Sequence, residues 1–244
     1  MTRVELVVVL AISAILVVLL LPALSTARRG PGRPVREVKM EIGSLVAAIY
    51  QYQAMYGRFP VSSNASSTSD FTFGTYGTGD EALGITNASG YQANNSEVMA
   101  ILMDLDKFPN GESTINADHS RNPQRTPFFN AKMTGSTNSP GLGPDYVYRD
   151  PWGHPYIITI DLNGDKKCRD AFYRLASVSE TASAMGSHAY LTRPSPPPYS
   201  SDDARDSFEV PNATVIVWSF GPDGKADKTQ KANEGVNKDN ITSW

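Results

Sequence analysis

Residues 1–24 read MTRVELVVVLAISAILVVLLLPAL and carry no charged side chain after Glu5. At ~1.5 Å per residue, a helix over residues 6–24 spans roughly 29 Å, close to the apolar thickness of a bilayer. The chain as a whole has a mean hydropathy of −0.31, so this block stands apart from the rest. The segment therefore predicts a helix over residues 1–29 that enters a membrane or a helical bundle.

Glu5 separates the interpretations of this segment. A carboxylate beside a run of aliphatic residues is costly in lipid unless a partner group pairs with it. A secretory signal peptide and a plain membrane anchor remain alternatives, but neither needs such a charge, and a buried core helix is rarely so uniformly apolar. A helix held in register beside an identical helix does need the charge, because a partner group satisfies it at one height only.

Residues 1–6, MTRVEL, resemble the mature N-terminus of type IV pilins and type II secretion pseudopilins, which read F/M-T-L-x-E-L. The resemblance implies that Met1 is exposed by a prepilin peptidase and methylated, and that Glu5 pairs with the amine of an adjacent subunit. Pro22 matches the proline that loosens the pilin helix, as proline does inside helices. Arg3 departs from the family pattern, which has an apolar third residue.

Residues 30–60 predict an amphipathic continuation of the helix. The sequence GPGRP at 30–34 predicts a break or bent joint, and helical spacing resumes at Val35. Gly57 and Pro60, within YQAMYGRFP, predict the helix end. That phrase resembles the YxxxxGxYP of the pilin family. The apolar stripe that should cover a sheet consists of Val38, Ile42, Leu45, Val46, Ile49 and Tyr50.

The remainder predicts a small sheet and a long insert. Residues 61–145 are rich in Ser, Thr, Asn and Gly and predict loops with one short helix near 96–106; the insert either binds a partner or is a solvated decoration. Residues 146–244 contain strand-like stretches at 156–160 and 214–219, which are β-branched, and a possible return strand at 172–177. We therefore expect an α+β, pilin-like fold: a long N-terminal apolar helix whose C-terminal half packs on an antiparallel sheet of three or four strands.

Residues 150–156, DPWGHPY, resemble the DPWGxPY segment of major pseudopilins. The resemblance implies a structural role in which the prolines position the first strand and the tryptophan covers the edge of the core. His154 lacks a recognisable nucleophile or metal set, so catalysis is not expected. The motif residues are Asp150, Pro151, Trp152, Gly153, Pro155 and Tyr156.

Residues 218–227, WSFGPDGKAD, and 233–244, NEGVNKDNITSW, resemble the ending S-x-G-x-D-G…D-D-I-x-x-W of pseudopilins, which binds calcium. The resemblance implies Ca²⁺ on Asp223 and Asp239, with Asp227 and Glu234 as further acids nearby; a solvated polar tail is the alternative. Asn240 replaces the second acid of D-D-I. The sequence DLNGD at 161–165 lacks the glutamate of an EF-hand and predicts a turn.

Composition excludes several other classes. With 22 basic and 25 acidic side chains the chain does not resemble a general polyanion binder, so no specific nucleic acid is expected. A single cysteine, Cys168, rules out an intramolecular disulfide and cysteine-based metal sites. P-loop, GxSxG, HExxH and Rossmann glycine patterns are also missing, so we expect no enzyme.

Taken together, the resemblance implies the structural subunit of a type II secretion pseudopilus, a self-assembling helical polymer. Its expected partners are membrane lipid before assembly, the prepilin peptidase, an inner-membrane assembly platform and a motor ATPase. Its N-terminus would lie in the cytoplasm, its globular domain in the periplasm, and the assembled filament in the periplasm or at the cell surface. Two alternatives stay open: a surface pilus for adhesion, motility or DNA uptake, and a monomeric membrane-anchored binding module.

Overall fold

The computed structural model describes residues 32–63, 65, 70–74, 92–180, 191, 198 and 200–244. Met1, Glu5 and Pro22 lie outside the described residues, as does the apolar segment 6–24. The chain divides into two compact units, Met1–Glu37 and Val38–Trp244, and the contacts described below all lie within the second.

The first described helix, α2, spans Gly32–Tyr56. It begins inside the segment where glycine and proline predicted a break. Pro34 is tolerated there because the backbone N–H groups of a helix's first turn have no helical partner to lose. The helix ends at the expected place: Gly57 has a φ of +65°, and its N–H donates to the carbonyl of Gln53 at 2.8 Å.

The expected fold, with its long apolar N-terminal helix, is wrong. The helix that packs on the sheet is amphipathic, with Arg36, Glu37, Lys39 and Glu41 near its start. Within the described ranges, no helix is long and apolar enough to cross a membrane. The physical reason is composition, since residues 32–56 carry polar or charged side chains at every turn and can bury only one side.

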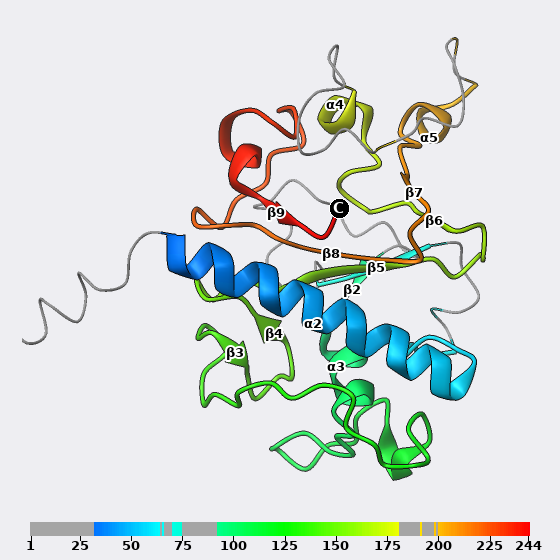
Figure 1. Ribbon diagram of the computed structural model, residues 1–244, viewed down its shortest axis with the longest axis vertical. Helices are drawn as coiled ribbons and strands as arrows, with labels where there is room; N and C mark the ends of the chain where they lie inside the picture. Colours follow the sequence, from blue (N-terminus) through cyan, green and yellow to red (C-terminus); the bar gives the residue numbers. More distant parts are fainter. Residues whose placement is uncertain are drawn as a thin grey trace, which may run out of the picture. The chain divides into compact units, whose positions relative to one another are not determined.

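From Val38 onward, α2 lies along the sheet (Figure 1). Its inner face is buried almost completely, and the Tyr156 hydroxyl donates a hydrogen bond to the Glu41 carboxylate. Its outer face leaves Met40 67% and Met55 44% exposed. The buried side chains of the inner face are Val38, Ile42, Leu45, Ala48, Ile49 and Tyr52.

The central sheet has five strands in the order β2-β1-β5-β8-β9, antiparallel except for the parallel pair β1–β2. Its strands are β1 Phe71–Phe73, β2 Gln92–Ala93, β5 Ile157–Ile160, β8 Val215–Ser219 and β9 Ile241–Thr242. Two small antiparallel pairs lie outside it: β3 Gly141–Leu142 with β4 Tyr148–Arg149, and β6 Lys167–Cys168 with β7 Val210–Pro211.

Two features of the sheet differ from the expectation. Strands β1 and β2 come from the insert at 61–145, so that segment completes the sheet rather than only decorating it. Residues 172–177, expected as a strand, instead form a turn that leads into helix α4, Ala176–Ser179. The turn forms because Asp170 Oδ1 accepts the backbone N–H groups of Phe172 and Tyr173, each at 2.9 Å.

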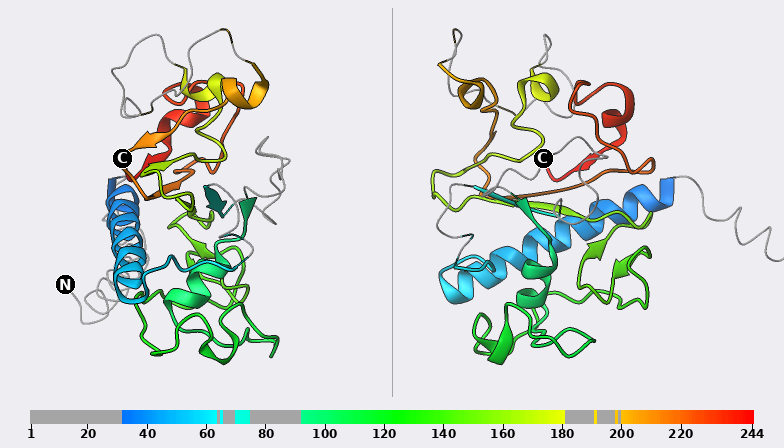
Figure 2. Two further views of the ribbon diagram at one scale, coloured as in Figure 1. Left: turned by 90° about the vertical axis from the view of Figure 1, so that its right-hand side faces the viewer. Right: turned by 180° about the vertical axis from the view of Figure 1, so that it is seen from behind.

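The short helices lie on opposite sides of the central sheet. Figures 1 and 2 show α3 on one side of β5 and β8, and α4 and α5 on the other. Their bounds are α3 Ser96–Leu102, η2 Ala117–His119, α5 Asp202–Arg205 and η3 Gly235–Asp239.

The core beside the C-terminal loops is aromatic. Trp218 on β8 has its ring centroid 5.2 Å from that of Tyr173 and 4.8 Å from that of Phe220. Because alternate strand residues face opposite sides, β5 and β8 bury one face against this cluster and the other toward α2. All residues of both strands are therefore buried. The cluster consists of Ile157, Phe172, Tyr173, Val178, Trp218, Phe220, Ala226 and Ala232.

Candidate functional site

The turn at 150–156 is organised by the buried carboxylate of Asp150. Its Oδ1 accepts the backbone N–H groups of Trp152 and His154, each at 2.9 Å. Gly153 has a φ of +93°, and a Cβ there would lie 2.6 Å from the carbonyl oxygen of Asn138. Glycine is therefore required at this position by both backbone conformation and space.

The same carboxylate joins this turn to the tail loop. Its Oδ2 accepts the hydroxyl of Ser219 at 2.6 Å, and Ser219 Oγ in turn accepts the N–H of Gly221 at 3.0 Å. Burial raises the pKa of Asp150, while the Ser219 hydroxyl and the N–H of His154 act in the opposite direction. The two motifs that the sequence offered separately are thus one structural unit.

His154 makes a second contact between the two motifs. A Cβ at Gly224, which has a φ of +65°, would lie 2.1 Å from His154 Nε2, so the ring packs directly on the loop backbone. His154 Nδ1 lies 3.8 Å from Asp150 Oδ1. The geometry supports a packing role for His154 rather than catalysis. Nothing in the sequence indicated that His154 or Ser219 joins the two motifs.

The other motif residues divide into buried and half-buried. Tyr156 is fully buried, and its carbonyl accepts the side-chain amide of Asn95 at 2.8 Å. Burial raises the pKa of its hydroxyl, and the hydrogen bond to Glu41 adds to this. Pro151, Trp152 and Pro155 are half-buried, and Trp152 is not part of the aromatic cluster around Trp218.

In the tail loop, Asp223 and Asp239 lie close enough to influence each other. Burial raises the pKa of Asp239, and the charge of Asp223 raises it further. Asp239 Oδ1 is shielded from solvent and has no hydrogen-bond partner within the described residues. Asp223 Oδ1 accepts the N–H of Lys225 at 2.9 Å. A Cβ at Gly221 would lie 2.2 Å from the carbonyl oxygen of Asp239, so the backbone at Gly221 is in close contact with the backbone at Asp239.

Asp227 and Glu234 do not extend this pair. The Asp227 carboxylate accepts the N–H and hydroxyl of Thr229 at 2.8 and 2.6 Å, and these bonds lower its pKa. Glu234 is exposed. Among the residues that the structure describes, no group of three or more His, Cys, Asp or Glu could hold a metal ion.

The buried side chain of Asn237 organises the loop around these acids. Its amide donates to the carbonyls of Asp227 and Gln230 at 2.8 and 2.9 Å, and its Oδ1 accepts the N–H of Asp227 at 2.8 Å. The side-chain amide of Asn240 donates a hydrogen bond to the Tyr173 hydroxyl at 3.1 Å. The sequence pattern did not single out Asn237, because asparagine is common in tails and turns.

The structure brings Asp223 and Asp239 near each other, without a further acid or histidine of the described residues to complete a metal group. Calcium takes six to eight oxygen ligands, so two carboxylates alone do not make up its coordination. The unpartnered Asp239 Oδ1 beside Asp223 is the observation that fits a cation. By contrast, both Asp161 oxygens in the DLNGD turn already accept backbone N–H groups, from Gly164 at 2.6 Å and Lys166 at 2.8 Å.

Comparison with protein-family models, with curated proteins and with solved structures gave no match to this chain.

Proposed function

We propose that this chain is the structural subunit of a type IV pilin-like filament, on the pseudopilus branch of type II secretion. The observation that carries the proposal is the unit formed by Asp150 and Ser219. It joins the two segments whose sequences resemble those of major pseudopilins.

In this proposal the apolar segment 6–24 lies in the inner membrane before assembly, with the globular domain in the periplasm. A prepilin peptidase processes the subunit, and a motor-driven platform moves the segment from lipid into contact with copies of itself. Glu5 then sets the register, since an unpaired carboxylate there is costly in an apolar setting. Pro22 gives this segment a point at which it can bend.

We also propose that Ca²⁺ binds at Asp223 and Asp239. The ion would supply positive charge between two like-charged carboxylates, and Asp239 Oδ1 is one of the buried acceptors for which the described residues supply no donor. The loop around it packs on His154 and Ser219, so the ion would stiffen the joint between tail and turn.

The filament proposal is tested with Glu5→Gln in cells that express the chain. The yield of fibres, collected from the periplasmic fraction as well as by shearing, should fall about tenfold or more, because the substitution removes one partner of a buried ion pair. Glu112→Gln, at an exposed side chain, should leave fibre yield unchanged. Fibres are counted by negative staining, and the chain is identified by peptide mapping.

Three outcomes separate the alternatives. Thin fibres released from the cell surface would replace the pseudopilus with a surface pilus, whereas short periplasmic fibres support it. Monomers in the membrane fraction that tolerate Glu5→Gln would instead indicate an anchored binding module and overturn the filament proposal.

A further inference from the structure

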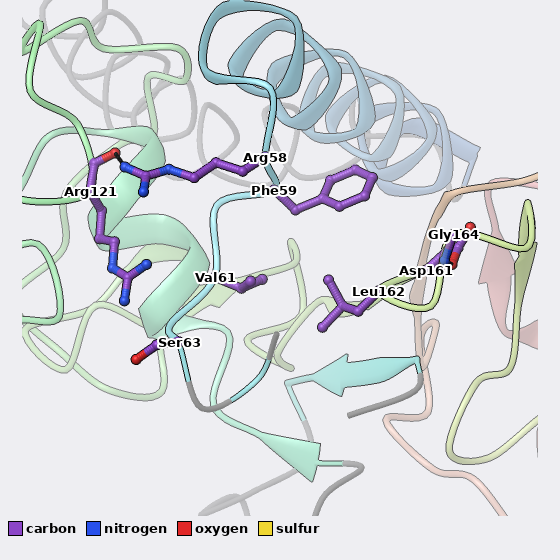
Figure 3. A pocket seen from close by; sticks show the side chains of 8 residues that line it. All are labelled: Arg58, Phe59, Val61, Ser63, Arg121, Asp161, Leu162 and Gly164. Carbon is purple, nitrogen blue, oxygen red and sulfur yellow. Dashed lines mark hydrogen bonds between the residues drawn. The ribbon is translucent and has the colours of Figure 1, made fainter. Parts of the chain in front are cut away.

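A pocket of about 410 Å³ opens between the end of α2 and the turn after β5. Figure 3 shows Arg58 and Arg121 along one side of it, Asp161, Leu162 and Gly164 on the opposite side, and Phe59 and Val61 between them. The volume lies within the roughly 300–1,000 Å³ range of small-ligand sites. The pocket combines the YGRFP phrase with the DLNGD turn, two motifs that the filament proposal does not use.

Among the described residues, the two arginines make few hydrogen bonds. Arg58 Nη2 donates to the carbonyl of Arg121 at 3.3 Å, and the Arg58 guanidinium also lies beside the Tyr52 hydroxyl. Within the described residues, the guanidinium of Arg121 donates none, and neither side chain has a carboxylate within ion-pair distance. Unpaired guanidinium groups at a pocket are the usual means of binding carboxylates and phosphates, which they hold with paired hydrogen bonds.

The backbone beneath the arginines is fixed in place. The Arg121 carbonyl also accepts the hydroxyl of the buried Tyr52 at 2.5 Å, and its N–H donates to Asn116 Oδ1 at 3.1 Å. Gly57, with its φ of +65°, turns the chain so that Arg58 and Phe59 leave the end of α2 toward the pocket. The charged side is therefore built on ordered backbone and not on a free surface loop.

The rest of the pocket lining is mainly apolar and carries no positive charge. Val61 is buried, while Phe59 and Leu162 are half-buried and line the space. The Asp161 carboxylate lies on the side opposite the arginines and accepts two backbone N–H groups. Its negative charge disfavours an anion on that side. The lining therefore favours one orientation of a bound molecule. Its anionic group would lie at the arginines and its apolar part toward Leu162.

We propose that this pocket binds an organic anion, in which a carboxylate or phosphate group is carried on a small apolar body. Arg58 and Arg121 hold the anionic group, and Phe59, Val61 and Leu162 cover the body. The site belongs to the globular domain and does not depend on whether the chain assembles into filaments.

The test uses the full chain in detergent, with 3-phenylpropionate as the carboxylate probe and phenyl phosphate as the phosphate probe. Backbone amide shifts of Phe59, Val61 and Gly164 are followed by NMR. We expect saturable shifts with a Kd of about 1 mM or tighter for at least one probe. The tighter of the two identifies the preferred head group. The neutral analogue 3-phenyl-1-propanol should bind at least about tenfold more weakly, since it cannot form charge-assisted hydrogen bonds.

The matched variants are Arg58→Gln with Arg121→Gln, and Arg125→Gln as the control. Arg125 is exposed, belongs to the same loop as Arg121 and does not line the pocket. The double variant should bind the anionic probe about tenfold more weakly or worse, and Arg125→Gln should bind it as the wild type does. Amide shifts elsewhere show that each variant is folded. Absence of saturable shifts at about 10 mM probe, equal binding of the alcohol, or an equal loss in Arg125→Gln would each overturn the proposal.

Discussion

Asp150 shows how a single buried carboxylate can hold two distant segments together. Asp150→Asn keeps one acceptor for the turn but places an amide donor opposite Ser219, whose oxygen already accepts from Gly221. We expect a loss of about 1–3 kcal/mol in the free energy of unfolding, measured by urea denaturation. Asp118→Asn removes the same charge at an exposed position and should change this free energy by less than about 0.5 kcal/mol. Equal losses in both variants would contradict the role given to Asp150.

Asp70 makes stability depend on pH. It is 3% exposed, and burial raises its pKa from 3.8 to about 7, against the N–H that Arg169 donates at 2.6 Å. The charges of Asp161, Asp165 and Glu209 add to the increase. Because the pKa is higher in the folded state, the folded protein binds more protons, and its stability falls as pH rises through about 7.

Asp70→Asn should therefore flatten the pH dependence. In the wild type we expect the thermal unfolding midpoint to decrease between about pH 5 and pH 8, and in the variant to decrease much less. Asp118→Asn serves as the control and should keep the wild-type slope. A variant with the full wild-type slope would mean that another buried carboxyl group, such as Asp150, dominates.

At the scale of elements, α2 is stabilised by its inner face. Leu45 is fully buried, so Leu45→Ala should lower the free energy of unfolding by about 2–5 kcal/mol. Met40 is 67% exposed on the same helix, and Met40→Ala should change it by less than about 0.5 kcal/mol. Both are measured by denaturant unfolding of the full chain. Similar losses at the two positions would mean that the outer face is also packed.

Helices and strands with a long, regular hydrophobic pattern could be predicted from the sequence. Short elements without such a pattern could not. The apolar stripe of α2 and the β-branched runs that became β5 and β8 extend over several residues of one pattern, although Val46 of the predicted stripe is only half-buried and Tyr50 is 39% exposed. Strands β1 and β2 are short and become strands only by pairing, β1 with β5 across a long stretch of sequence. Phe172 and Tyr173 have strand propensity, but the Asp170 carboxylate imposes a turn on them.

At the scale of the molecule, calcium should stabilise the tail. Addition of Ca²⁺ at about 100 times its Kd should add about 2.7 kcal/mol to the free energy of unfolding, which thermal melting detects. Asp223→Asn should remove that response, while Asp118→Asn should keep it. An equal thermal unfolding midpoint in chelator and in excess Ca²⁺ would contradict the proposal that calcium binds here.

The candidate sites could be predicted only as separate pieces. Motif residues such as Asp150 and Asp223 could be picked out because their local patterns are distinctive. The hydrogen bond from Ser219 to Asp150 and the pocket between Arg58 and Leu162 join residues far apart in the chain. No local pattern contains such contacts, because they arise only when the sheet brings its strands together.

The order of the strands has a consequence for how the domain is completed. Strand β8 is flanked by β5 and by β9, and β9 comes later in the chain than the other four. Until residues 241–242 have paired, Trp218 and Ser219 present an open edge of apolar sheet, which is the kind of surface that joins chains into aggregates. We therefore expect newly made chains of this protein to associate with one another more readily until β9 is in place.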